Sequence, residues 1–381
     1  MRNKTHLISA AAARDAAALF AATAMFAMGP AAARADGTPL GHSPLCEASA
    51  ALIVDCPGAS GSCLLVGDNE EEASLFWFRL DGTPLEKAKQ QQSKFKGGKI
   101  GDIEALTAAG EGRIAVFGSH SRSTTCRESK ERWRFGVIDG VKDKGVKLAL
   151  TESNEFNAST LFGRNLPKGS LIEAASLAIK TAEAGARKAE NDAEQCNQAP
   201  AYNAEGAVNV ASAGAPDIWI GLRSPLLPRP TQAKGGRHGL AVLMHLKGLD
   251  AYSFDKVAAL DLGGRGIREL AYADGWVLVI AGPPQDLKEE DDLKKWPDGK
   301  GPFRLMRFRA KELEAERVIV PGEEQAADLP ISSEGLAVFG DEIIVLIDGN
   351  QASKKQPTKC ATPAAFVVRK IADFVSKSSR E

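Results

Sequence analysis

A pattern that occurs five times constrains this chain more than any other feature. Each copy begins with a glutamate that opens a short apolar strand, turns tightly into a second apolar strand, and ends in Gly or Asp and polar residues. The opening glutamates are Glu47, Glu104, Glu205, Glu269 and Glu334. One such strand pair cannot bury its own apolar face, so regular copies are typical of arrays whose units share a core. The sequence therefore predicts an all-β repeat fold.

Further strands follow each pair. A third apolar segment is present in every copy, and a fourth in some copies, as at residues 146–150, 257–262 and 317–320. Four antiparallel strands in about 60 residues are the usual content of a propeller blade. We therefore predict that residues 36–381 form a single β-propeller domain of five blades, or of six if residues 139–202 contain another blade.

One interval between the repeated glutamates is longer than the others, and a helical pattern fills the excess. Small apolar residues recur at steps of three and four between Ser170 and Gln195, and Ser170 forms a capping box with Glu173. We predict one α-helix at about 170–195, within a helical insertion spanning 152–202, that packs on the propeller.

The last unit lacks an obvious fourth strand, because residues 373–381 are few and charged. Residues 36–40 and 81–85 have the same sequence, DGTPL, and the second copy stands where the outer strand of the first unit is expected. We therefore predict that residues 36–45 complete the last unit and close the ring from the N-terminal end.

The first 35 residues resemble a secretory signal peptide. They start with a basic stretch, continue with apolar residues 16–29, too few to span a bilayer, and end in a small-x-small cleavage site at residues 33–35. Arg14 and Asp15 interrupt this pattern, so a start codon assigned too early is the competing interpretation. We expect the mature protein in the periplasm or outside the cell.

The charge of the chain argues against nucleic acid as a partner. Residues 1–35 carry four of the 48 basic and one of the 49 acidic residues, so their removal changes the net charge from −1 to −4. This charge is mild and unclustered, and no later stretch is apolar enough for a membrane span. We expect a monomer whose partner is a small ligand or another protein.

All six cysteines lie after residue 35, and an even number in an oxidising compartment predicts three disulfides. In each unit the first strand runs away from one face and the second strand returns to it. The segment that precedes a repeated glutamate and the segment that follows the second strand of a neighbouring unit therefore lie on the same face. A metal site is the alternative use of the cysteines, but the chain has no C-x-x-C pair. The predicted disulfides are Cys126–Cys196, Cys46–Cys360 and, across a short hairpin turn, Cys56–Cys63.

The same strand directions gather charged side chains on one face. Converging carboxylates repel one another unless arginines or a hard cation such as calcium neutralise them. The candidate metal ligands are Glu104, Glu205 and Glu334. The candidate ligand-binding residues are Arg122, Arg223, Arg268, Asn69 and Asn350. The main alternative for the glutamates is architectural, because a recurring polar residue in a repeat fold often bonds the backbone of the next unit.

His120 is the candidate catalytic residue. It lies between two serines and is followed closely by Arg122, a polar setting that suits a site, although a lone loop histidine is more often simply solvated. Arg223 is either a member of a structural ion pair or a clamp for an anion.

No sequence motif of a known reaction is present. Gly264-Arg265-Gly266 follows an apolar strand as in a dinucleotide loop, but the third glycine is missing. There is no nucleophile elbow, no paired-histidine zinc motif and no phosphate loop with its lysine.

Three segments, residues 221–226 (GLRSPL), 262–270 (LGGRGIREL) and 334–337 (EGLA), give the chain a resemblance to a bacterial family known as domain of unknown function 3616. The resemblance covers about Glu47 to Val368. It implies a secreted or periplasmic, propeller-like protein and supplies no catalytic residues. Glu104-Ala105 departs from the Glu-Gly of the third and fifth repeats.

These observations favour a periplasmic or secreted module that binds a ligand or partner through its glutamate- and arginine-lined face. The alternative is a cation-dependent hydrolase of an ester, lactone or phosphoester. In that enzyme, calcium or another divalent cation would bind the three candidate glutamates, His120 would be the general base, and Arg223 would hold the anionic group.

Overall fold

The structure is a computed structural model, and two compact units are distinguished in it, of which the second begins at residue 35. The predicted signal peptide, Asn350 and Cys360 lie outside the described residues. Those residues are 37–40, 45–57, 60–83, 92–140, 146–152, 160–199, 201–211, 214–228, 239–285, 296, 298–315, 317–322, 325–349 and 363–374.

The fold is mostly β and propeller-like, as the repeats predict. Two antiparallel four-strand units from the first part of the chain are joined edge to edge, because β5 and β9 pair in parallel through Phe95 and Val146. The first unit contains β2 (Ala48–Asp55), β3 (Ser62–Asp68), β4 (Ser74–Phe78) and β5 (Gln92–Lys96). The second contains β6 (Ile103–Ala108), β7 (Ile114–Gly118), β8 (Arg134–Ile138) and β9 (Val146–Glu152).

Two further sheets follow in the chain. The first is built on β10 (Asn203–Asn209), β11 (Ile218–Ser224), β13 (Gly239–Leu246) and β14 (Phe254–Leu260), with the short β12 (Leu227–Pro228) paired to β13. The next contains β15 (Gly266–Ala273), β16 (Trp276–Gly282), β17 (Arg304–Arg309) and β19 (Ala326–Asp328).

The last sheet confirms the predicted contribution of the N-terminal segment. It contains β20 (Ser333–Phe339), β21 (Glu342–Ile347) and β22 (Ala365–Lys370), and its fourth strand is β1 (Thr38–Pro39). Thr38 pairs with Phe366 and Pro39 with Ala365 in antiparallel register. A short 3₁₀ helix, η4 (Ile371–Phe374), follows β22.

Two predictions of outer strands, at residues 81–85 and 317–320, are wrong. Residues 81–83 form a turn, with the amide of Arg79 bonded to the carbonyl of Thr83, and the outer strand of the first unit is β5. Residues 317–320 contain β18 (Val318–Ile319), which leaves its own unit and pairs in parallel with β14. The 3₁₀ helix η2 (Ala310–Ala315) carries the chain across. Alternating apolar residues predict a strand but not its partner.

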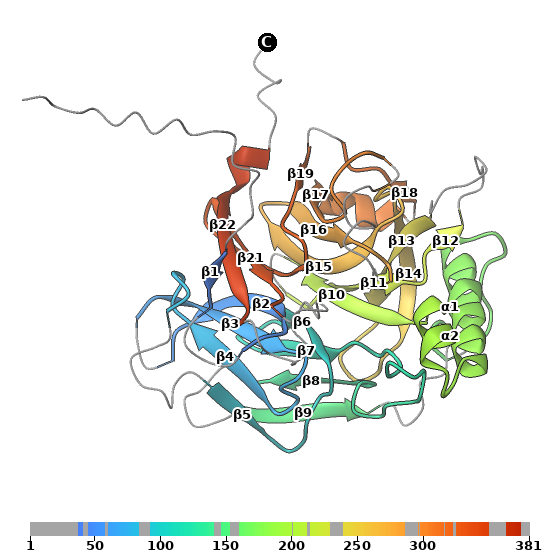
Figure 1. Cartoon of the computed structure of the whole chain (residues 1–381), viewed down its shortest axis with the longest axis horizontal. Coiled ribbons are helices and arrows are strands. Elements are labelled where there is room, and N and C mark those ends of the chain that lie inside the picture. The colour runs from blue at the N-terminus through green and yellow to red at the C-terminus, as the bar shows by residue number, and fades with distance from the viewer. Residues whose placement is uncertain are drawn as a thin grey trace, which may run out of the picture. The chain divides into compact units, whose positions relative to one another are not determined.

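The first strand of each unit is its innermost strand, and these five strands contact one another in a closed series: β2, β6, β10, β15 and β20. β2 contacts β6 and β20, β6 contacts β10, and β15 contacts both β10 and β20. In Figure 1, β2, β6, β10 and β15 lie in the middle of the β-rich unit. Buried apolar side chains fill the space between neighbouring sheets, so each sheet buries both faces without forming a core of its own.

The predicted helix is present, with a break that the pattern did not predict. α1 (Leu171–Lys188) begins at Ser170, whose hydroxyl accepts the amide of Glu173, and α2 (Ala193–Gln198) begins at Asp192. α1 contacts β12 and β14 and buries Ile172, Ala175 and Ile179 against them (Figure 1). None of the helices described is long and apolar enough to cross a membrane.

Two of the three predicted disulfides are confirmed. Cys56 bonds Cys63 within the β2–β3 hairpin, and Cys126 bonds Cys196 of α2, which ties the loop after β7 to the helical insertion. The third pair, Cys46–Cys360, stays a prediction because Cys360 lies outside the described residues.

Candidate functional site

Each innermost strand has a register irregularity near its first residues. In four strands the pairing skips one residue: Ser49 in β2, Glu104 in β6, Glu205 in β10 and Arg268 in β15. In β20 it skips Glu334 together with Gly335. A bulge re-aims a side chain out of the regular alternation. We call Ser49, Glu104, Glu205, Arg268 and Glu334 the bulge layer.

The bulge layer corrects the sequence alignment of the repeats. Glu104, Glu205 and Glu334 occupy equivalent positions, as predicted, but Ser49 and Arg268 stand where Glu47 and Glu269 were aligned. A repeat whose bulge holds Ser or Arg cannot be recognised by searching for a recurring glutamate. The equivalent position therefore contains three acids, one base and one hydroxyl.

An ion-pair network joins three members of this layer. The Arg268 guanidinium lies with its Nε 2.9 Å from Oε2 of Glu205 and with its Nη2 against Oε1 of Glu334. Arg223, at the end of β11, places its Nη1 3.0 Å from Oε1 of Glu205, which also accepts a 2.8 Å hydrogen bond from Asn203. The candidate residues Arg223, Arg268, Glu205 and Glu334 are therefore brought together.

Glu104 lies beside this network without a direct partner among the described residues. Only 6% of the residue is exposed. Burial raises the pKa of its carboxyl well above the ordinary value of 4.5, the charges of Asp102 and Glu205 raise the pKa further, and Arg268 and Arg223 oppose the rise. Asp102 is itself paired with Arg132 at 2.9 Å. Glu104 is thus the least compensated carboxyl of the layer.

Two other residues tie neighbouring innermost strands together. The Ser49 hydroxyl donates to the carbonyl of Ile103 in β6. Glu269 is fully buried and accepts the amide of Leu270 at 2.9 Å, and the backbone amides of Ala207 in β10 and Ala51 in β2 favour its charged form. Burial nevertheless raises the pKa of Glu269 well above its ordinary value. These contacts correspond to the architectural role considered for the repeated polar residues.

A glycine fixes the backbone that carries Arg223. A Cβ on Gly266, the first residue of β15, would lie 2.1 Å from the carbonyl oxygen of Arg223, so β11 and β15 approach as closely as they do only because residue 266 has no side chain. The Arg223 Nε atom donates to the carbonyl of Pro283 at 3.1 Å. Both contacts hold the guanidinium beside Glu205.

Arg265, in the glycine-rich segment, is part of a separate structural network. The side chain is completely buried, forms two bonds with Asp298, and donates to the carbonyls of Leu262, Gly301 and Pro302. Gly263 has a φ of 67°, which allows the tight turn around this guanidinium. The segment therefore orders the loop before β15, a role that no sequence motif indicated.

His120 is buried against an aromatic ring. It is 1% exposed, its ring stacks on Tyr252 with centroids 3.7 Å apart, and its Nδ1 donates to the carbonyl of Gly118 at 2.9 Å. Burial lowers the pKa of the imidazole to about 3. A neutral, stacked ring of this kind fills core volume.

The remaining candidates have separate surroundings. Arg122 is buried and bonds Glu183 of α1 at 2.9 Å and the carbonyl of Cys126 at 3.0 Å, which anchors the helical insertion. The backbone amide of Asn69 donates to the carbonyl of Glu47. The Oδ1 atom of the Asn69 side chain is enclosed without a hydrogen-bond partner in the described part of the chain. Asn350 lies outside that part.

The described residues contain no group of three or more His, Cys, Asp or Glu side chains that could hold a metal ion. Two of the three candidate ligands, Glu205 and Glu334, instead face arginines. The carboxylates of Glu205 and Glu334 suit ion pairing better than cation binding, because the arginine guanidinium groups occupy the oxygens that a cation would need.

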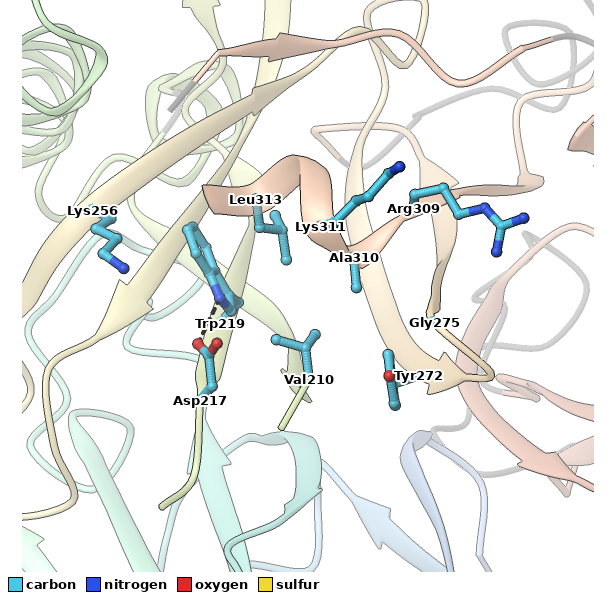
Figure 2. A pocket seen from close by; sticks show the side chains of 10 residues that line it. All are labelled: Val210, Asp217, Trp219, Lys256, Tyr272, Gly275, Arg309, Ala310, Lys311 and Leu313. Atoms are coloured by element: carbon cyan, nitrogen blue, oxygen red, sulfur yellow. Dashed lines mark hydrogen bonds between the residues drawn. The ribbon is translucent and has the colours of Figure 1, made fainter. Parts of the chain in front are cut away.

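Two cavities lie near the other ends of the innermost strands. One, of about 260 Å³, is lined by residues of all five, including Leu52, Leu106, Val208, Leu270 and Leu336. The second, of about 490 Å³, lies between the β10–β14 and β15–β19 sheets, and Figure 2 shows its side chains.

We call the ion-pair network of Arg223, Arg268, Glu205 and Glu334 the charged centre. Together with the strand pairing, it defines a propeller-like β protein. Residues 210–362 match the model of the family described as "Protein of unknown function (DUF3616)", which confirms the resemblance over this part of the chain. The matched region includes Arg223, Arg265, Arg268 and Glu334. No curated protein matches the chain.

Three of the solved structures that match are distant in sequence. The PQQ-bound aldose sugar dehydrogenase of Streptomyces coelicolor is 12% identical, with a TM-score of 0.36, over 87% of this chain and 96% of that one. A luciferin-regenerating enzyme is 10% identical, with a TM-score of 0.35, over 86% and 92%. An α-L-arabinofuranosidase of Clostridium thermocellum is 7% identical, with a TM-score of 0.35, over 84% and 89%. At these scores the matches carry no argument about activity.

Proposed function

We propose that this protein is a five-bladed β-propeller of the bacterial periplasm or cell exterior that binds a small ligand at its centre. The blade number rests on the five innermost strands and their closed series of contacts. The binding role rests on one observation: Glu104 is buried beside an ion-pair network without a direct partner among the described residues.

Charge balance supports this role. Arg223 and Arg268 compensate Glu205 and Glu334, so the network is neutral when Glu104 holds a proton. A protonated Glu104 avoids the cost of a buried, uncompensated charge. A ligand that brings an amine would supply the missing positive charge, and one that brings a hydroxyl would supply a hydrogen-bond donor.

In this proposal a ligand approaches the centre from the side on which the innermost strands begin. The side chains of Glu334 and Arg223 are 12% and 14% exposed, whereas that of Glu205 is 3% exposed. A ligand would therefore meet Glu334 and Arg223 first and reach Glu104 behind them. Ligands usually bind where a few polar groups converge in a concave, mostly enclosed site.

A thermal-shift screen of mature protein, residues 36–381, against small amines, amino alcohols and sugars tests this proposal. We expect at least one of these compounds to raise the melting temperature of the wild type and to lose this effect with Glu104→Gln. Glu111→Gln is the matched control, because the Glu111 side chain is 86% exposed. Equal shifts for Glu104→Gln and the wild type, or no shift with any compound, would contradict the proposal.

The same preparation distinguishes the binding module from a cation-dependent hydrolase. Elemental analysis and a melt with and without chelator measure whether a cation is bound. We expect no change of the melting temperature with chelator, because Glu205 and Glu334 are paired with arginines. Stoichiometric calcium that is lost together with stability would support Glu104, Glu205 and Glu334 as metal ligands instead.

A further inference from the structure

The 490 Å³ cavity lies away from the charged centre (Figure 2). Val210 follows the last residue of β10 and Tyr272 lies near the end of β15, whereas Glu205 and Arg268 lie near the beginnings of the same strands. A strand rises about 3.3 Å per residue, so four or five residues separate the two places by roughly 15 Å. The cavity is therefore a different site from the bulge layer.

One wall of the cavity crosses from one sheet to the next. η2 (Ala310–Ala315) leaves β17 and leads to β18, which pairs in parallel with β14 through Val318–Ala259 and Ile319–Leu260. Leu313 on η2 is only 1% exposed and belongs to the core shared by the two sheets. The wall is thus fixed at both ends by strand pairing and in the middle by packing.

Part of the inner surface is apolar, and its indole ring is held in place. Figure 2 shows Trp219, Leu313 and Val210 facing the same space. The indole Nε1 of Trp219 donates to Oδ1 of Asp217 at 2.9 Å, and Nε2 of His245 lies 3.2 Å from the same oxygen. These contacts orient the Trp219 ring and occupy the Asp217 carboxylate, which is the single acidic group among the described residues that line the cavity.

The cations lining the cavity outnumber this acid. Lys256, Arg309 and Lys311 line it, and all three are exposed. Within the described residues, neither lysine forms an ion pair, and the Arg309 guanidinium lies over the Trp276 ring at 3.8 Å from its centroid. The combination of an apolar wall, an oriented indole and uncompensated ammonium groups suits a ligand that carries both an apolar body and a negative charge.

We propose that this cavity binds a small organic anion, a carboxylate on an aromatic or alicyclic body. The apolar body would pack against Trp219 and Leu313. The two exposed lysines, Lys256 and Lys311, which Figure 2 shows on opposite sides of the Trp219 ring, would turn their ammonium groups toward the carboxylate. The volume lies within the roughly 300–1,000 Å³ typical of small-molecule sites.

Binding of 2-naphthoate to the mature protein, measured by calorimetry, tests the proposal, with 2-naphthalenemethanol as the uncharged analogue. We expect saturable binding of the carboxylate and binding of the alcohol weaker by about tenfold, the effect of two partly exposed charge pairs. The double variant Lys256→Gln/Lys311→Gln should lose about the same factor for 2-naphthoate and little for the alcohol.

The control Lys130→Gln/Lys188→Gln removes two exposed lysines elsewhere and should leave the affinity for 2-naphthoate unchanged. Glu104→Gln should also leave it unchanged, which separates this site from the centre. Equal affinity for the acid and the alcohol, unchanged affinity in the Lys256/Lys311 variant, or no saturable binding would overturn the proposal. Binding of an acidic peptide without binding of 2-naphthoate would overturn it in favour of a protein partner.

Discussion

The guanidinium of Arg268 pairs with the carboxylate of Glu205 at 2.9 Å, and this contact joins two neighbouring innermost strands, β15 and β10. Both side chains are almost completely buried, with 6% and 3% exposed. Each residue also lies at the bulge of its strand. The irregularity of the strands and the charge pairing at the centre are therefore parts of one arrangement.

Replacement of Arg268 by methionine should destabilise the fold. Arg268→Met removes the partner of Glu334 and one of two arginines beside Glu205, and a buried carboxylate left without its partner costs about 3 kcal/mol. Urea unfolding measures the loss. Arg187→Met, at a side chain 61% exposed, should change the free energy of unfolding by less than about 0.5 kcal/mol. Equal effects of the two substitutions would show that the Arg268 network carries no stability.

The sequence predicted the β-rich repeat fold, the inserted helix and the supply of a last strand by the N-terminal segment. These features depend on local patterns, such as apolar strand pairs, the Ser170 capping box and alanine periodicity. The partners of β18 and the true outer strand of the first unit could not be predicted. Both depend on which strand lies alongside in space, and alternating apolar residues carry no information about that neighbour.

For the candidate site, the sequence identified Glu104, Glu205, Glu334, Arg223 and Arg268 but not the equivalence of Ser49 and Arg268 with the glutamates. The bulges displace the register by one residue, and a bulge has no fixed residue type. His120 and Arg122 lie next to each other in sequence, yet they face Tyr252 and Glu183. Side-chain direction in a loop depends on tertiary contacts that no local motif records.

The buried Glu104 carboxyl should make stability depend on pH. Its pKa is raised in the folded protein, chiefly by burial, so the folded state keeps a proton that the unfolded chain releases above 4.5. The free energy of unfolding therefore falls as the pH rises from 4.5 to the folded pKa, by up to about 1.4 kcal/mol per pH unit.

Glu104→Gln removes this titration. The difference in unfolding free energy between the variant and the wild type should therefore grow in favour of the variant as the pH rises above 4.5. Urea unfolding at several pH values between 4 and 8 gives the difference directly. Glu111→Gln, at an exposed side chain, should run parallel to the wild type. A parallel curve for Glu104→Gln would mean that Glu104 is ionised in both states.

The disulfide between Cys126 and Cys196 should contribute more stability than the hairpin disulfide. It closes a loop of 70 residues, whereas Cys56–Cys63 closes one of seven. Chain entropy predicts losses of about 4 and 2 kcal/mol for the two double Cys→Ser variants. Chemical denaturation under non-reducing conditions measures both, and the reverse order would contradict the entropic account. Peptide mapping without reduction should also recover a Cys46–Cys360 linked pair.

Gly266 and Gly185 should respond in opposite directions to replacement by alanine. At Gly266 the new Cβ would lie 2.1 Å from the Arg223 carbonyl oxygen, so β11 and β15 must separate, at a cost of about 3 kcal/mol. At Gly185, within α1, a Cβ meets nothing within 4 Å, and alanine should stabilise the helix by about 0.5–1 kcal/mol.

Denaturant unfolding measures both variants, and ligand binding at the centre adds a second readout for Gly266→Ala. Arg223 and Glu205 lie on paired strands of one sheet, so separation of β11 from β15 moves both away from Arg268. This variant should therefore also weaken binding of any centre ligand found with the wild type. The 2-naphthoate site, formed near the other ends of β10 and β15, should keep its affinity. A Gly266→Ala protein as stable as Gly185→Ala would mean that the two strands can separate without cost. The close approach would then not be what positions Arg223.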